Sequence, residues 1–366
     1  MSGAVQGRQE VNRPNRQDDS KACLRYISQE QCLETRGVWE EVFSEDSQIF
    51  TEYYYRVKAP ANEGFVLEGS DGIRAMLFLT PEKMQIHETQ VQSAYIVGVA
   101  TRQQYRHRGY MACLLRESFQ MLRQRKVPFV FLMPASAAIY EPFGFRFIYD
   151  RPIWDAETLQ MEKLQQLGEE SIGLMADFSN KWLASENGVY ICRDEVYDKV
   201  MLEELQAQNG CVLGYVGEDA KLQGLCLYTC EEGEADIQEV LADPEAESCF
   251  VQRTPETKPC IMGRILHLPA LLELLRSANG ETICFGLQVE DTQIPENNGL
   301  FVCTADKDSC SVSREVDQTE SSFLWKGTAA ELIQQIFAYK AEEQKPGEEL
   351  WKHLRLLTPV WINEIV

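Results

Sequence analysis

The chain has 366 residues, of which 44% are hydrophobic, so it is long enough for two or three domains with a sizeable core. Acidic residues outnumber basic residues by 57 to 35, and the formal net charge is −22. A field of this sign repels nucleic-acid phosphates and anionic membranes, so we expect neither as a partner. It attracts cationic amines, although solubility alone explains the charge equally well.

Twelve cysteines are spread along the chain without a Cys-x-x-Cys pair or accompanying histidines. This pattern predicts no metal site, and free thiols in a reducing compartment are the simplest interpretation. No segment has the apolar core of a signal peptide or the length of a transmembrane helix. We therefore expect a cytoplasmic protein with a disordered N-terminus over residues 1–20.

The first predicted elements are helices over residues 23–55, which are dense in aromatic side chains. Four acidic residues lie among the aromatics: Glu40, Glu41, Glu45 and Asp46. A solvated helix face is the ordinary role of such carboxylates. The apolar runs 65–67 and 73–79 flank Glu-Gly-Ser-Asp-Gly, which predicts a β-hairpin.

A buried strand over residues 94–100 is the next prediction, and a basic turn and a helix follow it. The turn contains Arg102, Arg106, His107, Arg108 and Gly109. The helix has one apolar stripe, made of Met111, Leu114, Leu115, Phe119 and Leu122. Backbone N–H groups at a helix start lack partners and the helix dipole adds positive charge there, so the turn predicts a phosphate or pyrophosphate site. A solvated basic loop would use the same residues, and the turn alone does not decide between the two.

A second buried strand is predicted over residues 127–133, and it leads into Tyr140-Glu-Pro-Phe-Gly-Phe145. This region resembles the acetyl-CoA core of the GNAT acetyltransferases. It has, in the same order, a strand, Arg106-x-x-Gly109, a helix, a strand and this motif. The segments Gly98-Val-Ala-Thr101 and Tyr105-Arg-His-Arg-Gly-Tyr110 are most similar to the Eis-like (enhanced intracellular survival) branch. Many GNAT proteins have glycine or alanine where this chain has Met111, and the Eis-like branch tolerates bulky residues there.

The resemblance implies an acetyl-CoA cosubstrate and direct transfer of its acetyl group to a primary amine in a ternary complex. The residues that it implies for holding acetyl-CoA are Val97, Gly98, Val99, Arg106, His107, Arg108, Gly109, Tyr110, Met111, Ala135 and Ser136. It implies Tyr140 as the catalytic acid, because a phenol is protonated at neutral pH and can donate to a leaving thiolate. The alternative is a core tyrosine with a satisfied hydroxyl. The first helices would wall the acceptor pocket, where acidic residues could hold a cationic substrate.

The resemblance also implies that the chain's terminal carboxylate, on Val366, enters the active site as the base. The tail from Trp361 to Val366 is more apolar than a frayed end requires. An α-carboxyl with a pKa of about 3.5 is a poor base for an amine with a pKa of about 10, unless burial raises the carboxyl pKa or water relays the proton. Glu364 is the alternative base, and its ordinary role would be that of a solvated partner to a lysine or arginine.

We expect an α/β (α+β) protein of three parts: a GNAT domain over residues 21–152, a degenerate GNAT-like domain over 153–258 and a sterol-carrier-like domain over 259–366. The second part has a predicted helix over 172–184, followed by predicted strands over 211–216, 222–229 and 235–242. After the last of these strands comes an acidic loop, Asp-Pro-Glu-Ala-Glu, at the position where the GNAT domain has its basic turn. An acidic loop repels a pyrophosphate, so we expect the second part not to bind one.

Residues 250–260, with Pro255 and Pro259, are predicted to be a linker. The third part has predicted strands over 261–267, 283–289, 300–305 and 309–315, a helix opened by Pro269, and a capping box from Thr328 to Glu331.

Two classes of function remain open. One is an N-acetyltransferase that acts on an aminoglycoside-like polyamine, a polyamine or a lysine side chain. The other is a non-catalytic protein that binds acyl-CoA or an apolar ligand, since a fold does not determine its function. The resemblance further implies a homo-hexamer.

Overall fold

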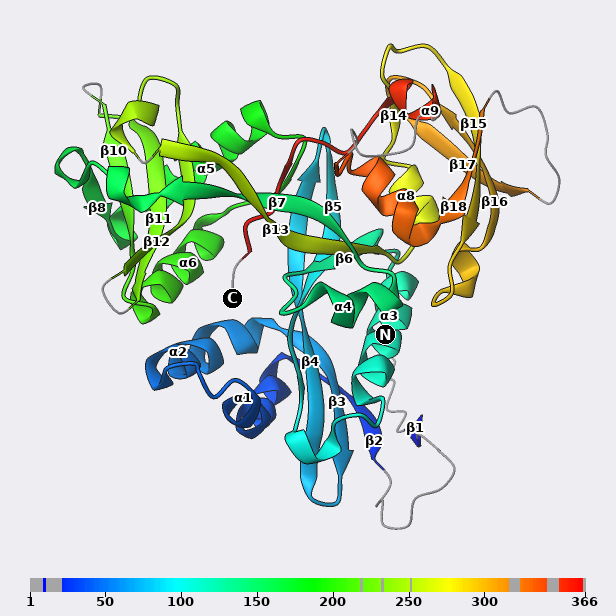
Figure 1. Cartoon of the computed structure of the whole chain (residues 1–366), viewed down its shortest axis with the longest axis horizontal. Coiled ribbons are helices and arrows are strands. Elements are labelled where there is room, and N and C mark those ends of the chain that lie inside the picture. The colour runs from blue at the N-terminus through cyan, green and yellow to red at the C-terminus, as the bar shows by residue number, and fades with distance from the viewer. Residues whose placement is uncertain are drawn as a thin grey trace, which may run out of the picture. The chain divides into compact units, whose positions relative to one another are not determined.

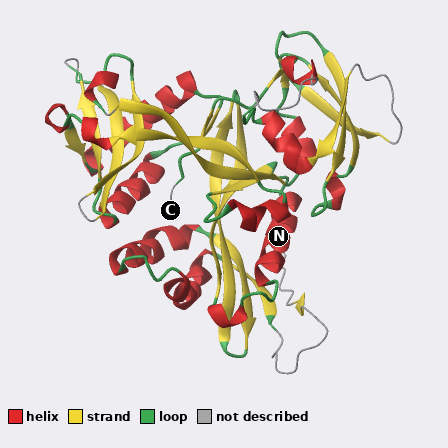
Figure 2. Ribbon diagram, in the orientation of Figure 1, coloured by secondary structure: helices red, strands yellow, loops and turns green. Residues whose placement is uncertain are grey.

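The computed structural model describes residues 9–10, 22–217, 220–231, 234–250, 252–315, 323–340 and 349–364. The chain divides into two compact units, the first formed by Met1–Pro81 with Ala94–Arg125 and the second by Glu82–Ser93 with Lys126–Val366 (Figure 1). Helices and strands are mixed in both (Figure 2), so the predicted α/β class is confirmed. The boundaries of the three predicted parts stay predictions.

The first unit is built on antiparallel pairs of strands, β1 (Gln9–Glu10) with β2 (Cys23–Ile27), β2 with β3 (Glu63–Gly69), and β3 with β4 (Gly72–Ile86). It includes β4 as far as Pro81 and the part of β5 (Thr89–Thr101) that begins at Ala94. The predicted hairpin is confirmed, because Gly69 pairs with Gly72 across the turn between β3 and β4. Of the N-terminus predicted to be disordered, only β1 belongs to the described residues.

The helices of the first unit are η1 (Gln29–Thr35), α1 (Arg36–Val42), α2 (Gln48–Tyr53), η2 (Tyr54–Lys58), η3 (Ala59–Ala61), η4 (Gln103–Tyr105) and α3 (Tyr110–Gln124). The predicted helix α3 is confirmed, and its stripe is buried at Leu114, Leu115, Phe119 and Leu122. The helical prediction for residues 23–27 is wrong. They form β2, because pairing with β3 overrides a local pattern too short to separate strand from helix.

The second unit contains β6 (Phe129–Leu132), β7 (Arg146–Asp155) and β13 (Gln252–Ile265). β13 pairs antiparallel with both other strands, so the predicted linker over residues 250–260 is wrong. Its two prolines, Pro255 and Pro259, fall where the register with β7 shifts, which is where a strand tolerates a residue without an N–H group. β6 is the strand predicted over residues 127–133.

A four-stranded antiparallel sheet follows in the same unit, in the order β12, β11, β10, β8. Its strands are β8 (Gln165–Leu167), β10 (Cys211–Val216), β11 (Leu222–Glu231) and β12 (Glu234–Ala242). The helices α5 (Ile172–Glu186) and α6 (Glu195–Ala207) lie beside it (Figure 1). The predictions for α5 and the last three strands are confirmed, whereas the sequence analysis missed α6. Short helical turns connect this region: η6 (Ala156–Thr158), η7 (Met161–Lys163), η8 (Glu169–Ser171) and η9 (Glu247–Cys249).

The last sheet has the order β17, β16, β15, β18, and β18 runs parallel to β15. Its strands are β15 (Ile283–Glu290), β16 (Gly299–Ala305), β17 (Cys310–Glu315) and β18 (Phe323–Thr328). Helix α8 (Ala329–Ile336) contacts β7 and β13. Its predicted capping box is confirmed, since Thr328 Oγ1 accepts from Glu331 N at 3.1 Å. The remaining elements are α7 (Leu268–Leu272), β14 (Arg276–Ser277), η10 (Pro295–Asn297), α9 (Glu349–Lys352) and β19 (Leu354–Arg355).

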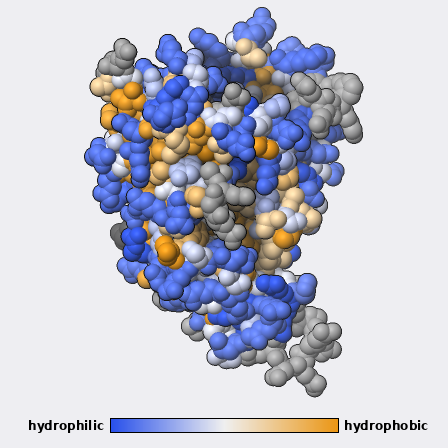
Figure 3. Space-filling view, turned by 60° about the vertical axis from the view of Figure 1, so that its left-hand side comes forward, coloured by the Kyte–Doolittle hydropathy of each residue, from blue (hydrophilic) through white to orange (hydrophobic). Residues whose placement is uncertain are grey.

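The end of the described chain adds a strand beside β9 (Val189–Ile191), which also pairs with β4. β20 (Val360–Trp361) pairs in parallel with β9, and the Trp361 ring packs against the core formed by α5, α6 and the second sheet. Within the described part of the chain, no helix is long and apolar enough to cross a membrane. The face drawn in Figure 3 is mostly hydrophilic, with apolar patches among the hydrophilic residues.

Candidate active site

The predicted phosphate turn lies in the first unit, between the end of β5 and the start of α3. His107 and Gly109 both have positive φ, at 62° and 77°. Alternation of such residues with ordinary ones turns successive backbone N–H groups toward one concavity, which binds anions. Gly109 is the N-cap of α3 and supplies no side chain to the first turn of this 15-residue helix. The unpaired N–H groups and the dipole of the helix therefore face the same place as the turn.

A stack of side chains holds this turn against the β3–β4 hairpin. Two guanidinium groups lie over the Tyr105 ring, with Arg74 Cζ 4.6 Å and Arg108 Cζ 5.2 Å from the ring centroid. The Tyr105 hydroxyl donates to the Asp71 carboxylate, which also pairs with Arg74 at 2.7 Å. The hydrogen bonds from Tyr105 and Arg74 lower the pKa of Asp71. The turn is therefore braced before any ligand binds.

Arg74 and Asp71 were missed by the sequence analysis. The available signal was a charged residue inside the apolar run 73–79, together with an aspartate in the hairpin turn. Of the predicted ligands, Arg106 and His107 are exposed, while Arg108, Gly109, Tyr110 and Met111 are half-buried. Among the described residues, Arg106 pairs with no carboxylate and donates to the Thr101 carbonyl at 3.2 Å. An exposed guanidinium beside a preformed concavity fits a pyrophosphate.

The predicted residues of β5 form a local irregularity of the strand. Gly98 has a φ of 60°, which interrupts the extended backbone, and the flanking Val97 and Val99 are half-buried. A Cβ on Gly98 would lie 2.9 Å from the Trp39 ring and 3.1 Å from the Phe78 ring, so only glycine fits. A glycine with positive φ is typical of a β-bulge, in which ladder pairing is locally interrupted, and we use the term Gly98 bulge for this irregularity.

Trp39 connects this bulge to an acidic residue. Its indole Nε1 donates to Asp46 Oδ2 at 2.8 Å, and its ring stacks on Tyr54 at 4.1 Å. Burial raises the pKa of Asp46 more than the indole bond lowers it. Two other acidic residues of this region are paired instead, Glu40 with Arg36 and Glu41 with Arg102. Asp46 is therefore held by Trp39, whose ring also packs over Gly98, and the sequence did not single out Trp39.

The turn that bears Tyr140 lies in the second unit. Ala135 and Ser136 are exposed after β6, and α4 (Ala137–Tyr140) and η5 (Glu141–Phe143) follow. Tyr140 is buried, and its ring meets Phe145 edge-on at 5.8 Å. Burial raises the pKa of the Tyr140 hydroxyl to about 12. In the part of the chain that the structure describes, this hydroxyl has no hydrogen-bond partner, whereas a core tyrosine normally finds one.

The C-terminal segment is held in place in the second unit. Trp361 Nε1 donates to Glu239 Oε1 at 2.6 Å, and Glu239 forms a buried double hydrogen bond with Arg193, both lengths being 2.7 Å. Tyr197 donates to Glu364 Oε1 at 2.8 Å, so the partner of Glu364 is a tyrosine and not the expected lysine or arginine. Val366 lies outside the described residues, and its predicted role stays a prediction.

The family comparison agrees with the first part of this description. A family model described as an acetyltransferase (GNAT) domain matches residues 24–148. That range contains β5, the Arg106–Gly109 turn, α3, β6 and the Tyr140 turn. The chain thus contains a GNAT acetyltransferase domain, whose cosubstrate is an acyl-CoA. No curated protein matches the chain.

The solved structures extend the similarity of fold to most of the chain. A probable N-acyltransferase from Enterococcus faecalis V583 aligns with a TM-score of 0.73 at 16% identity, over 90% of this chain and 94% of its own. A GCN5-related N-acetyltransferase from Kribbella flavida aligns at 0.70 and 15% identity, over 94% and 99%. Eis1 from Mycobacterium abscessus aligns at 0.61 and 12% identity, over 92% and 94%. The fold is thus similar to that of GCN5-related N-acetyltransferases and of Eis1, which is consistent with the resemblance that the motifs show.

Proposed function

We propose that this protein transfers the acetyl group of acetyl-CoA to a primary amine, directly and in a ternary complex. The observation that carries the proposal is the GNAT match over residues 24–148, with the braced, positively charged turn at Arg106–Gly109 inside it. No observation favours the alternative of a non-catalytic binding protein.

In this proposal, the first unit holds the cosubstrate. Backbone N–H groups of the turn and of the first turn of α3 bind the pyrophosphate, and Arg106 and Arg108 neutralise its charge. Val97, Gly98 and Val99 offer strand N–H groups to the pantetheine amides and to the acetyl carbonyl, which polarises that carbonyl. Ala135 and Ser136 are further candidate residues for binding the cosubstrate.

Tyr140 is the proposed hydrogen-bond donor to the leaving sulfur. In the reaction the amine nitrogen forms a bond to the carbonyl carbon, the carbon–sulfur bond breaks, and one proton passes from nitrogen to the thiolate. A thiol has a pKa of about 8.5, and that of Tyr140 is raised to about 12. Complete proton transfer from Tyr140 would thus cost about 5 kcal/mol. The hydroxyl therefore acts by stabilising the developing thiolate, and the proton that ends on sulfur comes from the amine.

The carboxylates of the first helices support a polyamine as the acceptor. Asp46 is fixed by the Trp39 indole beside the Gly98 bulge, where a second ammonium group of a polyamine could bind. For the base we propose the terminal carboxylate of Val366, with Glu364 as the alternative. The Tyr197 hydrogen bond supports Glu364 as a fixed carboxylate.

The test is a screen of amines that follows thiol release from acetyl-CoA. Polyamines, aminoglycosides and a lysine peptide are the acceptors, and a neutral alcohol is the control. Amine-dependent thiol release with acetylated product in equal amount supports the enzyme. Acetyl-CoA binding without release by any acceptor supports the non-catalytic alternative.

A further inference from the structure

The turn that bears Tyr140 is held internally by short-range backbone hydrogen bonds. Gly144 N donates to the Glu141 carbonyl at 3.0 Å, and Phe145 N reaches the Tyr140 carbonyl at 3.4 Å, which is a long bond. Arg146 adds two bonds to the carbonyl groups of Glu141 and Phe145. Glu141 and Pro142 are exposed. Such a turn needs support from outside if it is to hold an aromatic ring in one position.

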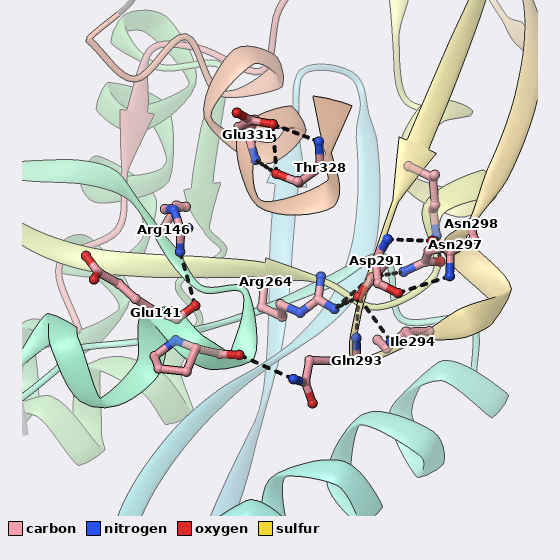
Figure 4. A network of polar contacts seen from close by, with 12 residues as sticks. Glu141, Arg146, Arg264, Asp291, Gln293, Ile294, Asn297, Asn298, Thr328 and Glu331 are labelled. Atoms are coloured by element: carbon pink, nitrogen blue, oxygen red, sulfur yellow. Dashed lines mark hydrogen bonds and ion pairs between the residues drawn. The ribbon is translucent and has the colours of Figure 1, made fainter. Parts of the chain in front are cut away.

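That support comes from a buried ion pair between β13 and the loop after β15 (Figure 4). Arg264 Nη2 donates to both oxygens of Asp291, at 2.6 and 2.7 Å, and both side chains are at most 2% exposed. Three further groups fix the Asp291 carboxylate, namely the backbone N–H groups of Gln293 and Ile294, each at 3.0 Å, and Asn297 Nδ2, at 3.0 Å. Because these three groups hold the Asp291 carboxylate in place, the Arg264 guanidinium that donates to it also has a fixed position.

The guanidinium of Arg264 lies directly against the turn. A Cβ on Gly144 would be 2.9 Å from Arg264 Nε and 3.1 Å from Cζ. Gly144 has a φ of 84°, so glycine is needed here for conformation as well as for space. The same loop makes a second contact, since Gln293 Nε2 donates to the Pro142 carbonyl at 3.3 Å. Asp291 thereby orders Arg264 and Gln293, which both contact the turn. Its carboxylate binds the Arg264 side chain and the backbone N–H group of Gln293.

Stability alone is a weak reason for this arrangement. A buried ion pair must overcome the desolvation of both charges, and apolar replacements of similar volume are often equally stable. The Arg264 guanidinium is flat and charged, and Asp291 holds it in one orientation. It therefore gives the glycine turn a single defined position, which apolar packing would not do.

We propose that Arg264, ordered by Asp291, is a positioning residue for Tyr140, and that Gln293 assists it. The C-terminal sheet thereby sets the geometry of the catalytic turn. This inference rests on the proposed function of Tyr140 as donor to the leaving sulfur.

The first test uses amide hydrogen exchange of the ligand-free protein, which does not depend on activity. Arg264→Lys keeps the charge and loses the flat guanidinium, and exchange over residues 140–146 should become about tenfold faster or more. The control is Thr328→Ala, which removes the capping box of α8 in the same unit without touching the turn. Unchanged exchange in Arg264→Lys, or equal acceleration by Thr328→Ala, would overturn the proposal.

The second test uses steady-state kinetics. Arg264→Lys should lower kcat by about tenfold to a hundredfold, the range for a small misplacement of a reacting group, with the KM for acetyl-CoA changed by less than about twofold. In the Tyr140→Phe background the same substitution should cause no further loss, because its effect acts through the hydroxyl. The same proportional loss in both backgrounds would show a merely structural role.

Gln293→Ala and Tyr140→Phe decide the question if Arg264→Lys alone does not. If Arg264→Lys does not fold, Gln293→Ala replaces it, because this exposed contact can be lost without exposing a buried charge. A Gln293→Ala protein with wild-type exchange and kcat would then refute the inference. If Tyr140→Phe retains wild-type kcat, the proposed role of Tyr140 fails, and the exchange experiment alone decides whether Arg264 orders the turn.

Discussion

Arg106 and Arg108 lie on either side of His107, whose positive φ bends the turn before α3. Replacing both arginines with alanine should weaken acetyl-CoA binding about tenfold or more, since charge-assisted bonds to phosphate contribute about 1.5–3 kcal/mol each. Calorimetric titration measures the change. Arg116→Ala, an exposed arginine later on α3, is the control and should bind normally. Equal affinity in all three proteins would refute the pyrophosphate assignment.

Gly98 combines a left-handed backbone with close packing. Gly98→Ala should lower the free energy of unfolding by about 1–3 kcal/mol, through strain at positive φ and contact with Trp39 and Phe78. Gly72→Ala separates the two causes, because Gly72 also has positive φ but has no atom within 4 Å of the added Cβ. Thermal unfolding of both variants gives the comparison. If both lose the same stability, packing against Trp39 contributes nothing.

At the scale of elements, α6 carries an unusual carboxylate in its first turn. Asp198 is fully buried, and both of its oxygens lack a hydrogen-bond partner among the described residues. Burial raises its pKa to about 7, with repulsion from Glu239 and Asp194 opposing the attraction of Arg193. Between an unfolded pKa of about 3.9 and this value, the folded state binds more protons than the unfolded state.

The free energy of unfolding should therefore decrease as the pH rises from about 4 to about 7, and the contribution of Asp198 should level off above that. Asp198→Asn stays neutral at every pH and should flatten this slope. Urea unfolding across the pH range measures it, with the exposed residue of α5 changed in Asp177→Asn as control. A slope in Asp198→Asn equal to that of the wild type would contradict the raised pKa.

For the whole molecule, the net charge of −22 creates a field that acts on cationic acceptors. If that field assists encounter, the kcat/KM for a polycationic amine should fall several-fold between roughly 20 and 200 mM salt, because screening shortens the Debye length. A monoamine should lose less. Steady-state kinetics with both acceptors at fixed acetyl-CoA provide the measurement. Equal salt slopes would show that the charge serves solubility alone.

The candidate site was predictable in its local parts. The turn at Arg106–Gly109, the α3 stripe and the Tyr140 motif are contiguous patterns, and the structure forms each of them as an element. The supporting side chains were not predictable. Arg74 and Arg264 are single charges within apolar runs, and Trp39 is one of many aromatic residues in its segment, so the roles of all three depend on partners that only folding brings near.

By itself, the sequence determined those features whose cause lies within a few residues, such as the β3–β4 hairpin and the Thr328 capping box. Turn residues and helix caps act through neighbouring backbone groups, so their effect can be read along the chain. Tertiary structure alone decided that residues 23–27 form a strand and that β13 accommodates two prolines, because pairing with a distant strand supplies the free energy. It also decided that Trp361 meets Glu239 and that Arg264 meets Asp291, since a buried charge is stable only where the fold brings its partner.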